Sequence, residues 1–262
     1  MGRKRSAPVV IAIGGSDPSG GAGVQADCRS LDSLGVSPAT VLTAVTVQTG
    51  ARVELARALA PALVVRQLRA LVDSRAVAAV KCGMMASTEI VRALAPLLAD
   101  LAVPLVVDPV TIASGGERLG SARLPAALSA HLFPIATVVT ANLAEAAALA
   151  GVEVSDEDGM AAAARAIGRT GTRAVVVKGG HLRTDPVDIL WDGRRVRRFP
   201  STRIGGRDMH GTGCAFAAAV AAGLAHRRSL SRSVAAAGDH VRDLIASAAR
   251  SRGGAWLREP GG

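Results

Sequence analysis

Short apolar runs alternate with longer stretches of helical periodicity along this chain. Six runs have the length and composition of β-strands, and several are apolar on both faces, as buried parallel strands are: residues 8–13, 39–47, 76–82, 103–108, 136–141 and 173–178. Four helical stretches separate them: residues 23–35, 60–75, 87–101 and 155–171. This alternation predicts an α/β fold with a mostly parallel central sheet and helices on both faces.

Residues near the helix ends support these boundaries. The first helix stops at Gly35, because glycine readily adopts the left-handed backbone that ends helices. Ser87 and Thr88 are candidate N-caps of the third helix, and Ser155 is the expected N-cap of the fourth.

One segment departs from the alternation. Asp192 and Gly193 separate two extended runs within residues 187–199, which predicts a small β-hairpin. The rest of the chain is expected to form two closing helices and two loose termini: residues 211–227, 231–250, 1–7 and 251–262. Because no repeat or linker interrupts the pattern, we expect a single domain over residues 1–262.

Composition narrows the class of protein. Apolar residues make up 49% of the chain, enough for a large core. The net charge of +10 comes from arginines that are scattered along the sequence, aromatic residues make up 2% and tyrosine is absent. Stacked aromatic rings are the usual platform for single-stranded nucleic acid. We therefore expect no nucleic-acid partner, and we attribute the charge to a preference for arginine throughout the chain rather than to one binding surface.

Cysteine use and hydropathy indicate an intracellular protein. The three cysteines, Cys28, Cys82 and Cys214, show no CxxC spacing, which argues against a disulfide framework or a structural zinc site. The first apolar run is short for a signal peptide, and no uninterrupted apolar stretch reaches the length of a membrane span. We expect a cytoplasmic protein with no membrane partner.

Polar and glycine residues follow almost every predicted strand. Ligands of parallel sheets bind beyond the carboxyl ends of the strands, so these segments should line one site. The first loop, "GGSDPSGGAGVQAD", opens a helix, but it lacks the GxGxxG spacing of dinucleotide sites. Gln48 also stands after the second strand, where a ribose-binding acid would be needed. The first loop and Gln48 together therefore argue against a dinucleotide as the ligand.

Hard oxygen groups follow two neighbouring strands. Asp108 ends one strand, and Asn142 and Glu145 open the helix after the next. Together they suit Mg²⁺ that keeps most of its water and is completed by phosphate oxygens. Alternatively, Asn142 and Glu145 cap that helix. Lys81 and Lys178 each end a strand as well, either as site residues or as side chains that reach solvent at the sheet rim.

The segment "HGTGC" precedes a long alanine-rich helix. Gly211, Thr212 and Gly213 can direct backbone amides at one point, and the helix dipole adds positive charge there. Such an anion hole suits a phosphoryl group in transfer. The same field is expected to lower the pKa of the Cys214 thiol, which can then accept a proton from a hydroxyl. The alternative is that Cys214 is a small, buried helix-start residue.

These motifs carry a resemblance. "SDPSGGAGVQAD" with "HGTGC", and between them "VKCGMMAS", "VVDPV", "VVTANLAEAAALAG" and "VVVKGGHL", occur in the order of the ribokinase superfamily. From about residue 8 to residue 250 the chain resembles the hydroxymethylpyrimidine/phosphomethylpyrimidine kinases of thiamine biosynthesis. The resemblance implies a ribokinase-like fold, a homodimer, and the use of ATP and Mg²⁺ for two successive phosphorylations of the pyrimidine.

The resemblance also implies roles for individual residues. The pyrimidine would be bound by Gln48, Gly15, Asp17 and Asp27. The nucleotide would be bound by Asn142, Glu145, Lys178, Gly180 and His210, with Asp108 and Glu145 at Mg²⁺. Gly211, Thr212 and Gly213 would form the anion hole, and Cys214 would face the attacking hydroxyl.

The covering loop "DPVTIASGGERL" departs from the family pattern. Thr111 and Ser114 stand where methionine and lysine are usual, and Ala141 and Ala144 replace two prolines near the next strand. A pyridoxal kinase of the same branch is the alternative activity. Some pyridoxal kinases carry an additional cysteine in this loop, where this chain has Ala113. That difference favours the pyrimidine as substrate.

Overall fold

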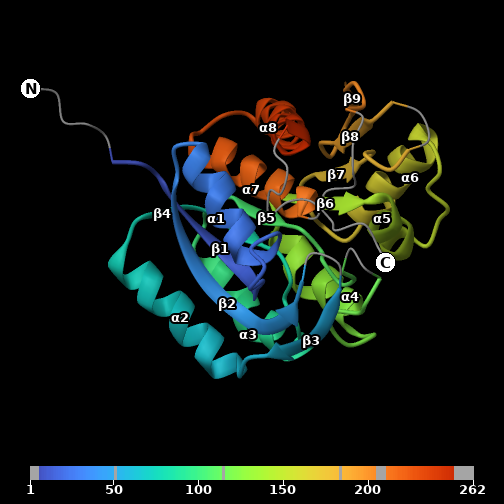
Figure 1. Cartoon of the computed structure of the whole chain (residues 1–262). Helices are drawn as coiled ribbons and strands as arrows, with labels where there is room; N and C mark the ends of the chain where they lie inside the picture. Colours follow the sequence, from blue (N-terminus) through green and yellow to red (C-terminus); the bar gives the residue numbers. More distant parts are fainter. Residues whose placement is uncertain (1–5, 50–51, 114–115, 183–184, 205–210, 251–262) are drawn as a thin grey trace, which may run out of the picture.

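The computed structural model describes residues 6–49, 52–113, 116–182, 185–204 and 211–250. Its nine strands are β1 (Val9–Ser16), β2 (Ser37–Gln48), β3 (Val53–Ala58), β4 (Val77–Cys82), β5 (Leu105–Val107), β6 (Val138–Asn142), β7 (Val175–Lys178), β8 (Val187–Trp191) and β9 (Val196–Pro200). They form one sheet in the order β3-β2-β1-β4-β5-β6-β7-β8-β9 (Figure 1). The six predicted strands are all present, and they form its parallel centre.

The helices are α1 (Gly23–Ser33), α2 (Pro61–Ser74), α3 (Thr88–Asp100), α4 (Leu124–Ala127), α5 (Leu143–Ala150), α6 (Glu157–Gly168), α7 (Thr212–Ala225) and α8 (Leu230–Arg250), with short turns η1 (Leu128–Leu132) and η2 (Phe133–Ile135). Among them, α1, α7 and α8 cover one face of the sheet, and α2 to α6 cover the other (Figure 1). The predicted α/β architecture is therefore confirmed. No helix among the described residues is long and apolar enough to cross a membrane.

Strand β1 explains why the core has two layers. Its side chains alternate, so that Ile11 and Ile13 pack toward α2 and α3 while Val10 and Ala12 pack toward α7. Helix α7 is buried around most of its circumference, and its small alanine side chains allow close approach to the sheet. The start of α7 is thereby fixed against the carboxyl ends of the central strands.

Antiparallel strands close both edges of the sheet. The predicted hairpin is β8–β9, and the Asp192 carboxylate stabilises its turn by accepting from the amides of Arg194 and Arg195. At the opposite edge β3 pairs with β2, a strand that the hydrophobic pattern did not predict because its side chains are only partly buried.

The helix caps agree with the sequence in one case and differ in another. Ser87 caps α3 by accepting from the amide of Ile90, as predicted. The expected cap Ser155 is wrong, because Asp156 caps α6 by accepting from the amide of Gly159. The extended backbone of Asp156 places its carboxylate three residues before that amide, the usual N-cap spacing.

Candidate active site

The carboxyl ends of β1, β4, β5, β6 and β7 meet at one edge of the sheet, beside the start of α7. This edge carries the predicted site residues of those strands and of the loops that follow them. The arrangement follows from parallel pairing, which brings all of the following loops to the same side.

The loop between β1 and α1 is organised by Asp17. One carboxylate oxygen accepts from the amide and hydroxyl of Ser19 at 2.8 and 2.7 Å, and the other accepts from the amide of Ala22 at 2.7 Å. Asp17 is 2% exposed. Both oxygens therefore bond to the loop itself, and the structure gives Asp17 a part in shaping the glycine-rich turn behind the expected pyrimidine site.

The starts of α1 and α7 touch through glycines. A Cβ atom on Gly211 would lie 2.0 Å from the carbonyl oxygen of Gly21, and one on Gly23 would lie 2.4 Å from that of Gly15. Gly211 also has a φ of 85°, in the left-handed region that favours glycine. These contacts leave no room for a side chain and bring the first turns of both helices to the end of β1.

Gly211→Ala is expected to destabilise the fold by about 2–4 kcal/mol, because the methyl group adds backbone strain to an overlap with Gly21. Gly35→Ala is the matched control. Gly35 has a similar φ of 72°, but a Cβ atom added there would have no neighbouring atom within 4 Å, so only the strain of about 1 kcal/mol is expected. Urea unfolding measures both. Equal losses in the two variants would show that the helix starts do not touch.

Cys214 lies in the first turn of α7, and the amide of Gly23 at the start of α1 is close enough to lower the pKa of its thiol. The first amides of an α-helix have no acceptor within the helix, so those of α7 point outward beside this sulfur. The expectation of a lowered pKa is wrong. Burial raises the pKa of the Cys214 thiol to about 11, and Asp27 and Asp108 add to the rise, against Lys81 and the Gly23 amide.

Lys178 reaches the start of α7 from the end of β7. Its Nζ donates to Oδ1 of Asp108 at 2.9 Å, and that oxygen also accepts from the hydroxyl of Thr140 at 3.2 Å. A Cβ atom added to Gly213 would lie 3.2 Å from Nζ, so the ammonium lies against the first turn of the helix. Burial disfavours this charge, but Asp108 and Glu145 raise the pKa of Lys178, so it stays a cation.

Lys81 turns into the protein. Its Nζ donates to both oxygens of Asp27, at 2.9 and 2.8 Å, and both side chains are 1% exposed. The alternative that Lys81 reaches solvent at the sheet rim is therefore wrong, since α1 supplies a carboxylate inside the core. Asp27 is fully buried and both of its carboxylate oxygens bond to Lys81, and its expected contact with the pyrimidine stays a prediction.

Asn142 and Glu145 form a complete capping box at the start of α5. The Glu145 amide donates to Oδ1 of Asn142 at 2.8 Å, and the Asn142 amide donates to Oε2 of Glu145 at 2.9 Å. Burial raises the pKa of Glu145 to about 7, against the pull of Lys178. The alternative that Asn142 and Glu145 cap this helix is therefore confirmed, and the cap uses Oε2 of Glu145.

Among the described residues no group of three His, Cys, Asp or Glu side chains is placed to hold a metal ion. The site offers two hard carboxylates instead, Asp108 and Glu145, and the charge of Asp108 helps to raise the pKa of Glu145. This donor set suits Mg²⁺, which usually takes one or two carboxylates and completes its shell with water and phosphate oxygens. The residues present therefore fit a magnesium ion that arrives with a nucleotide.

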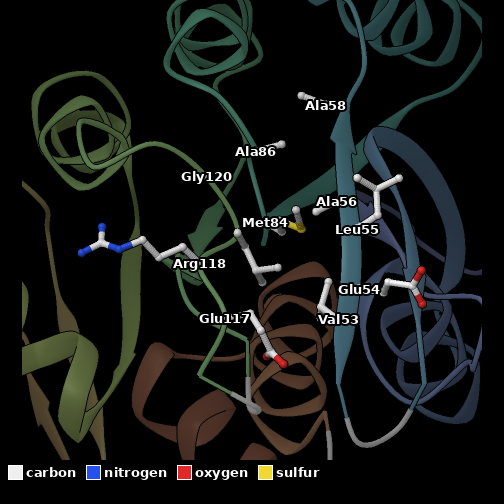
Figure 2. Close-up of a pocket in the computed structure, with 11 residues that line it drawn as sticks. Val53, Glu54, Leu55, Ala56, Ala58, Met84, Ala86, Glu117, Arg118 and Gly120 are labelled. Atoms are coloured by element: carbon white, nitrogen blue, oxygen red, sulfur yellow. The ribbon is translucent and has the colours of Figure 1, made fainter.

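A cavity of about 380 Å³ lies between β3 and the covering loop (Figure 2). Its walls come from β3, the segment after β4 and the end of the loop: Val53, Glu54, Leu55, Ala56, Ala58, Met84, Ala86, Glu117, Arg118, Leu119 and Gly120. Gln48 lies opposite Val53 in the β2–β3 ladder. The Met84 sulfur would lie 2.8 Å from a Cβ atom added to Gly15, so the cavity borders the ends of β1 and β2.

The remaining predicted residues are less central. Gly180 is exposed, and its carbonyl accepts from Arg203. His210 and Ser114 fall outside the described residues. Sequence reasoning missed Asp188, whose carboxylate accepts from the amide of Gly179 at 2.9 Å and holds the turn after Lys178. Its only local signal is an acid at the start of the predicted hairpin.

Comparison with known proteins adds to this geometry. Residues 17–256 match the family model described as phosphomethylpyrimidine kinase. The chain is 42% identical over 238 residues to a hydroxymethylpyrimidine/phosphomethylpyrimidine kinase of Streptomyces coelicolor, covering 91% of this chain and 88% of that one. It is 42% identical to the thiamine biosynthesis bifunctional protein ThiED of Geobacter sulfurreducens, covering 92% of this chain and 47% of that protein.

A solved structure is also similar. It is the pyridoxal kinase of Staphylococcus aureus in complex with AMP-PCP and pyridoxal, with a TM-score of 0.83 and 30% identity. The match covers 91% of this chain and 88% of that one.

Proposed function

The chain belongs to the phosphomethylpyrimidine kinase family, and from this premise we propose that it is an ATP-dependent kinase of thiamine biosynthesis. It phosphorylates the hydroxymethyl group of 4-amino-5-hydroxymethyl-2-methylpyrimidine and then phosphorylates the monophosphate to the diphosphate. The observation that carries the proposal is the meeting of Cys214, the first amides of α7 and the Lys178 ammonium at one point.

The amides of Gly211, Thr212 and Gly213, joined by that of Cys214, are the first four of α7 and receive the transferring phosphoryl group. Its charge is spread over three oxygens in the transition state, and fixed amide dipoles stabilise it without rearrangement. Lys178 adds a positive charge against the same turn, and Asp108 orients that charge. Asp108 and Glu145 would hold Mg²⁺, which, when bound, neutralises negative charge on the nucleotide phosphates.

Cys214 faces the substrate hydroxyl and takes its proton. Because burial raises the pKa of the thiol to about 11, the resting protein holds mostly the thiol, and its small thiolate fraction is strongly basic. The rate constant kcat/KM is therefore expected to rise with pH through the neutral range and beyond. A pH–rate profile that is flat between about pH 7 and pH 9 would contradict the need for a thiolate.

The pyrimidine ring occupies the cavity that borders Gly15 and Gln48. The amide of Gln48 can both donate and accept, which suits the edge of an aminopyrimidine. The apolar atoms of Val53 and Met84 line the cavity where the ring packs. The hydroxymethyl group then points from the cavity toward Cys214.

Substrate choice is tested by assaying hydroxymethylpyrimidine, its monophosphate and pyridoxal side by side with ATP. Both pyrimidines are expected to turn over faster than pyridoxal. A preference for pyridoxal would move the assignment to pyridoxal kinase, the second candidate, which is favoured by the likeness to the Staphylococcus aureus enzyme. Ala113, without a thiol, supports the first candidate.

Two further features are part of the proposal. The chain is one domain, and it acts as a homodimer. Light scattering at micromolar concentration measures the mass of the assembly, and a mass of about 26.5 kDa would indicate a monomer instead.

A further inference from the structure

Three elements, α7, α1 and β4, contribute charged and polar groups near Cys214. The start of α1 lies against the start of α7, because a Cβ atom on Gly211 would lie 2.0 Å from the carbonyl oxygen of Gly21. The amide of Gly23, the first residue of α1, also lowers the pKa of the Cys214 thiol. Asp27 lies four residues later, on the same face of that helix. Lys81, from β4, binds both carboxylate oxygens of Asp27. A partly buried thiol from α7 therefore lies beside a fully buried ion pair contributed by α1 and β4.

The ion pair is costly for a purely structural contact. Neither side chain has more than 1% of its surface exposed, and removing two charges from water often costs more than their attraction returns. Apolar side chains of similar volume would fill the same space without that cost. The Lys81 ammonium would also lie 2.7 Å from a Cβ atom added to Gly83, so glycine there leaves room for it.

The charges that act on the thiol come from every element packed around it. Lys81 lowers the pKa of Cys214, whereas Asp27 and Asp108 raise it. Lys178 also interacts with Cys214, and the thiolate raises the pKa of both lysines. The two members of the Lys81–Asp27 pair thus act on the thiol with opposite sign.

We propose that Lys81, held by Asp27, is a positioning residue that compensates the negative charge of the Cys214 thiolate before phosphoryl transfer. In that step the substrate O–H bond breaks and its proton passes to sulfur. The freed oxygen pair forms the new O–P bond, and the bond from phosphorus to the leaving ADP oxygen breaks. The thiol then returns its proton to solvent. This inference rests on the proposed function for its catalytic consequence, although not for the charge effect itself.

The test measures alkylation of Cys214 by iodoacetamide as a function of pH, followed by mass spectrometry of the Cys214 peptide. For the unaltered protein, the rate is expected to rise about tenfold per unit between about pH 7 and pH 10, because only the thiolate reacts. Lys81→Met is expected to slow alkylation at about pH 9 by tenfold or more, equivalent to one unit in pKa. Its kcat is expected to fall by a similar factor with KM unchanged.

Asp27→Asn is expected to change the alkylation rate in the opposite direction to Lys81→Met, and asparagine keeps the shape of the aspartate side chain. This substitution is expected to speed alkylation at the same pH severalfold, because a negative charge is removed near sulfur. General damage to the fold would shift both variants in the same direction. If Lys81→Met does not fold, Lys81→Gln replaces it, and unchanged or faster alkylation of Cys214 in that variant would overturn the proposal. Cys28→Ala is the control for alkylation elsewhere.

The alkylation profile needs no substrate, so the two proposals fail separately. If the two variants change the alkylation rate in opposite directions but the protein does not phosphorylate the pyrimidine, the proposed function is wrong and the charge role of Lys81 is retained. If the protein phosphorylates the pyrimidine but the variants leave the alkylation profile unchanged, the proposed function is retained and the charge role of Lys81 is wrong.

Discussion

Cys214→Ala is expected to lower kcat for hydroxymethylpyrimidine by about 10²–10⁴-fold, the range for losing a general base. Alanine keeps the backbone of α7 and its amides, so the anion hole remains while the proton acceptor is lost. Binding of ATP is expected to be unchanged, because the proposal places the sulfur beside the hydroxyl rather than beside the nucleotide. Steady-state kinetics on the purified variant measure the effect.

Cys28→Ala is the matched control for this variant. Cys28 is a half-buried thiol on α1, outside the cluster at the start of α7, and its loss is expected to leave kcat unchanged. If Cys214→Ala keeps full activity, Cys214 has only a packing role. The amides at the start of α7 and Lys178 would then carry catalysis without it.

Lys178→Gln is expected to lower kcat by about 10²–10³-fold, the usual loss when one donor to a developing oxyanion is removed. The variant also removes the ammonium that bonds to the buried Asp108 carboxylate. Weaker binding of the nucleotide is expected as well, since Asp108 loses its orientation. Stopped-flow measurement of the transfer step separates the two effects.

Arg198→Gln is the control for Lys178→Gln. Arg198 pairs with Glu157, but both side chains are well exposed, at 61% and 39%, and exposed pairs contribute little. No change in kcat is expected there. A loss of activity equal to that of Lys178→Gln would mean that general charge, rather than position at α7, governs the rate.

The sheet and the edge that carries the site could be predicted from sequence, because buried parallel strands are apolar runs and their following loops share one side. Glycines and polar residues after β1, β5, β6 and β7 therefore indicated where the site lies. Strand β3 could not be found this way, since it lies at the sheet edge and its side chains are only partly buried.

The ion pairs and pKa values of the site were harder to predict than its location in the fold. The partner of Lys81 lies 54 residues away in sequence, so no local pattern shows that the lysine turns inward. The pKa of Cys214 was predicted with the wrong sign, because the helix start was visible in the sequence while the burial around the sulfur was not. Asp17 and Asp27 were recognised as residues near the site, but their bonds to the Ser19 loop and to Lys81 depend on the folded chain.

The central claim concerns where the phosphoryl group and the substrate hydroxyl meet. A crystal structure with ADP, Mg²⁺, aluminium fluoride and hydroxymethylpyrimidine tests it directly. The fluoride group is expected to accept from the first four amides of α7, those of Gly211 to Cys214, with Lys178 beside it. The hydroxyl oxygen is expected within about 3.5 Å of the Cys214 sulfur. A fluoride group bound away from α7, or a hydroxyl turned toward another side chain, would contradict the account.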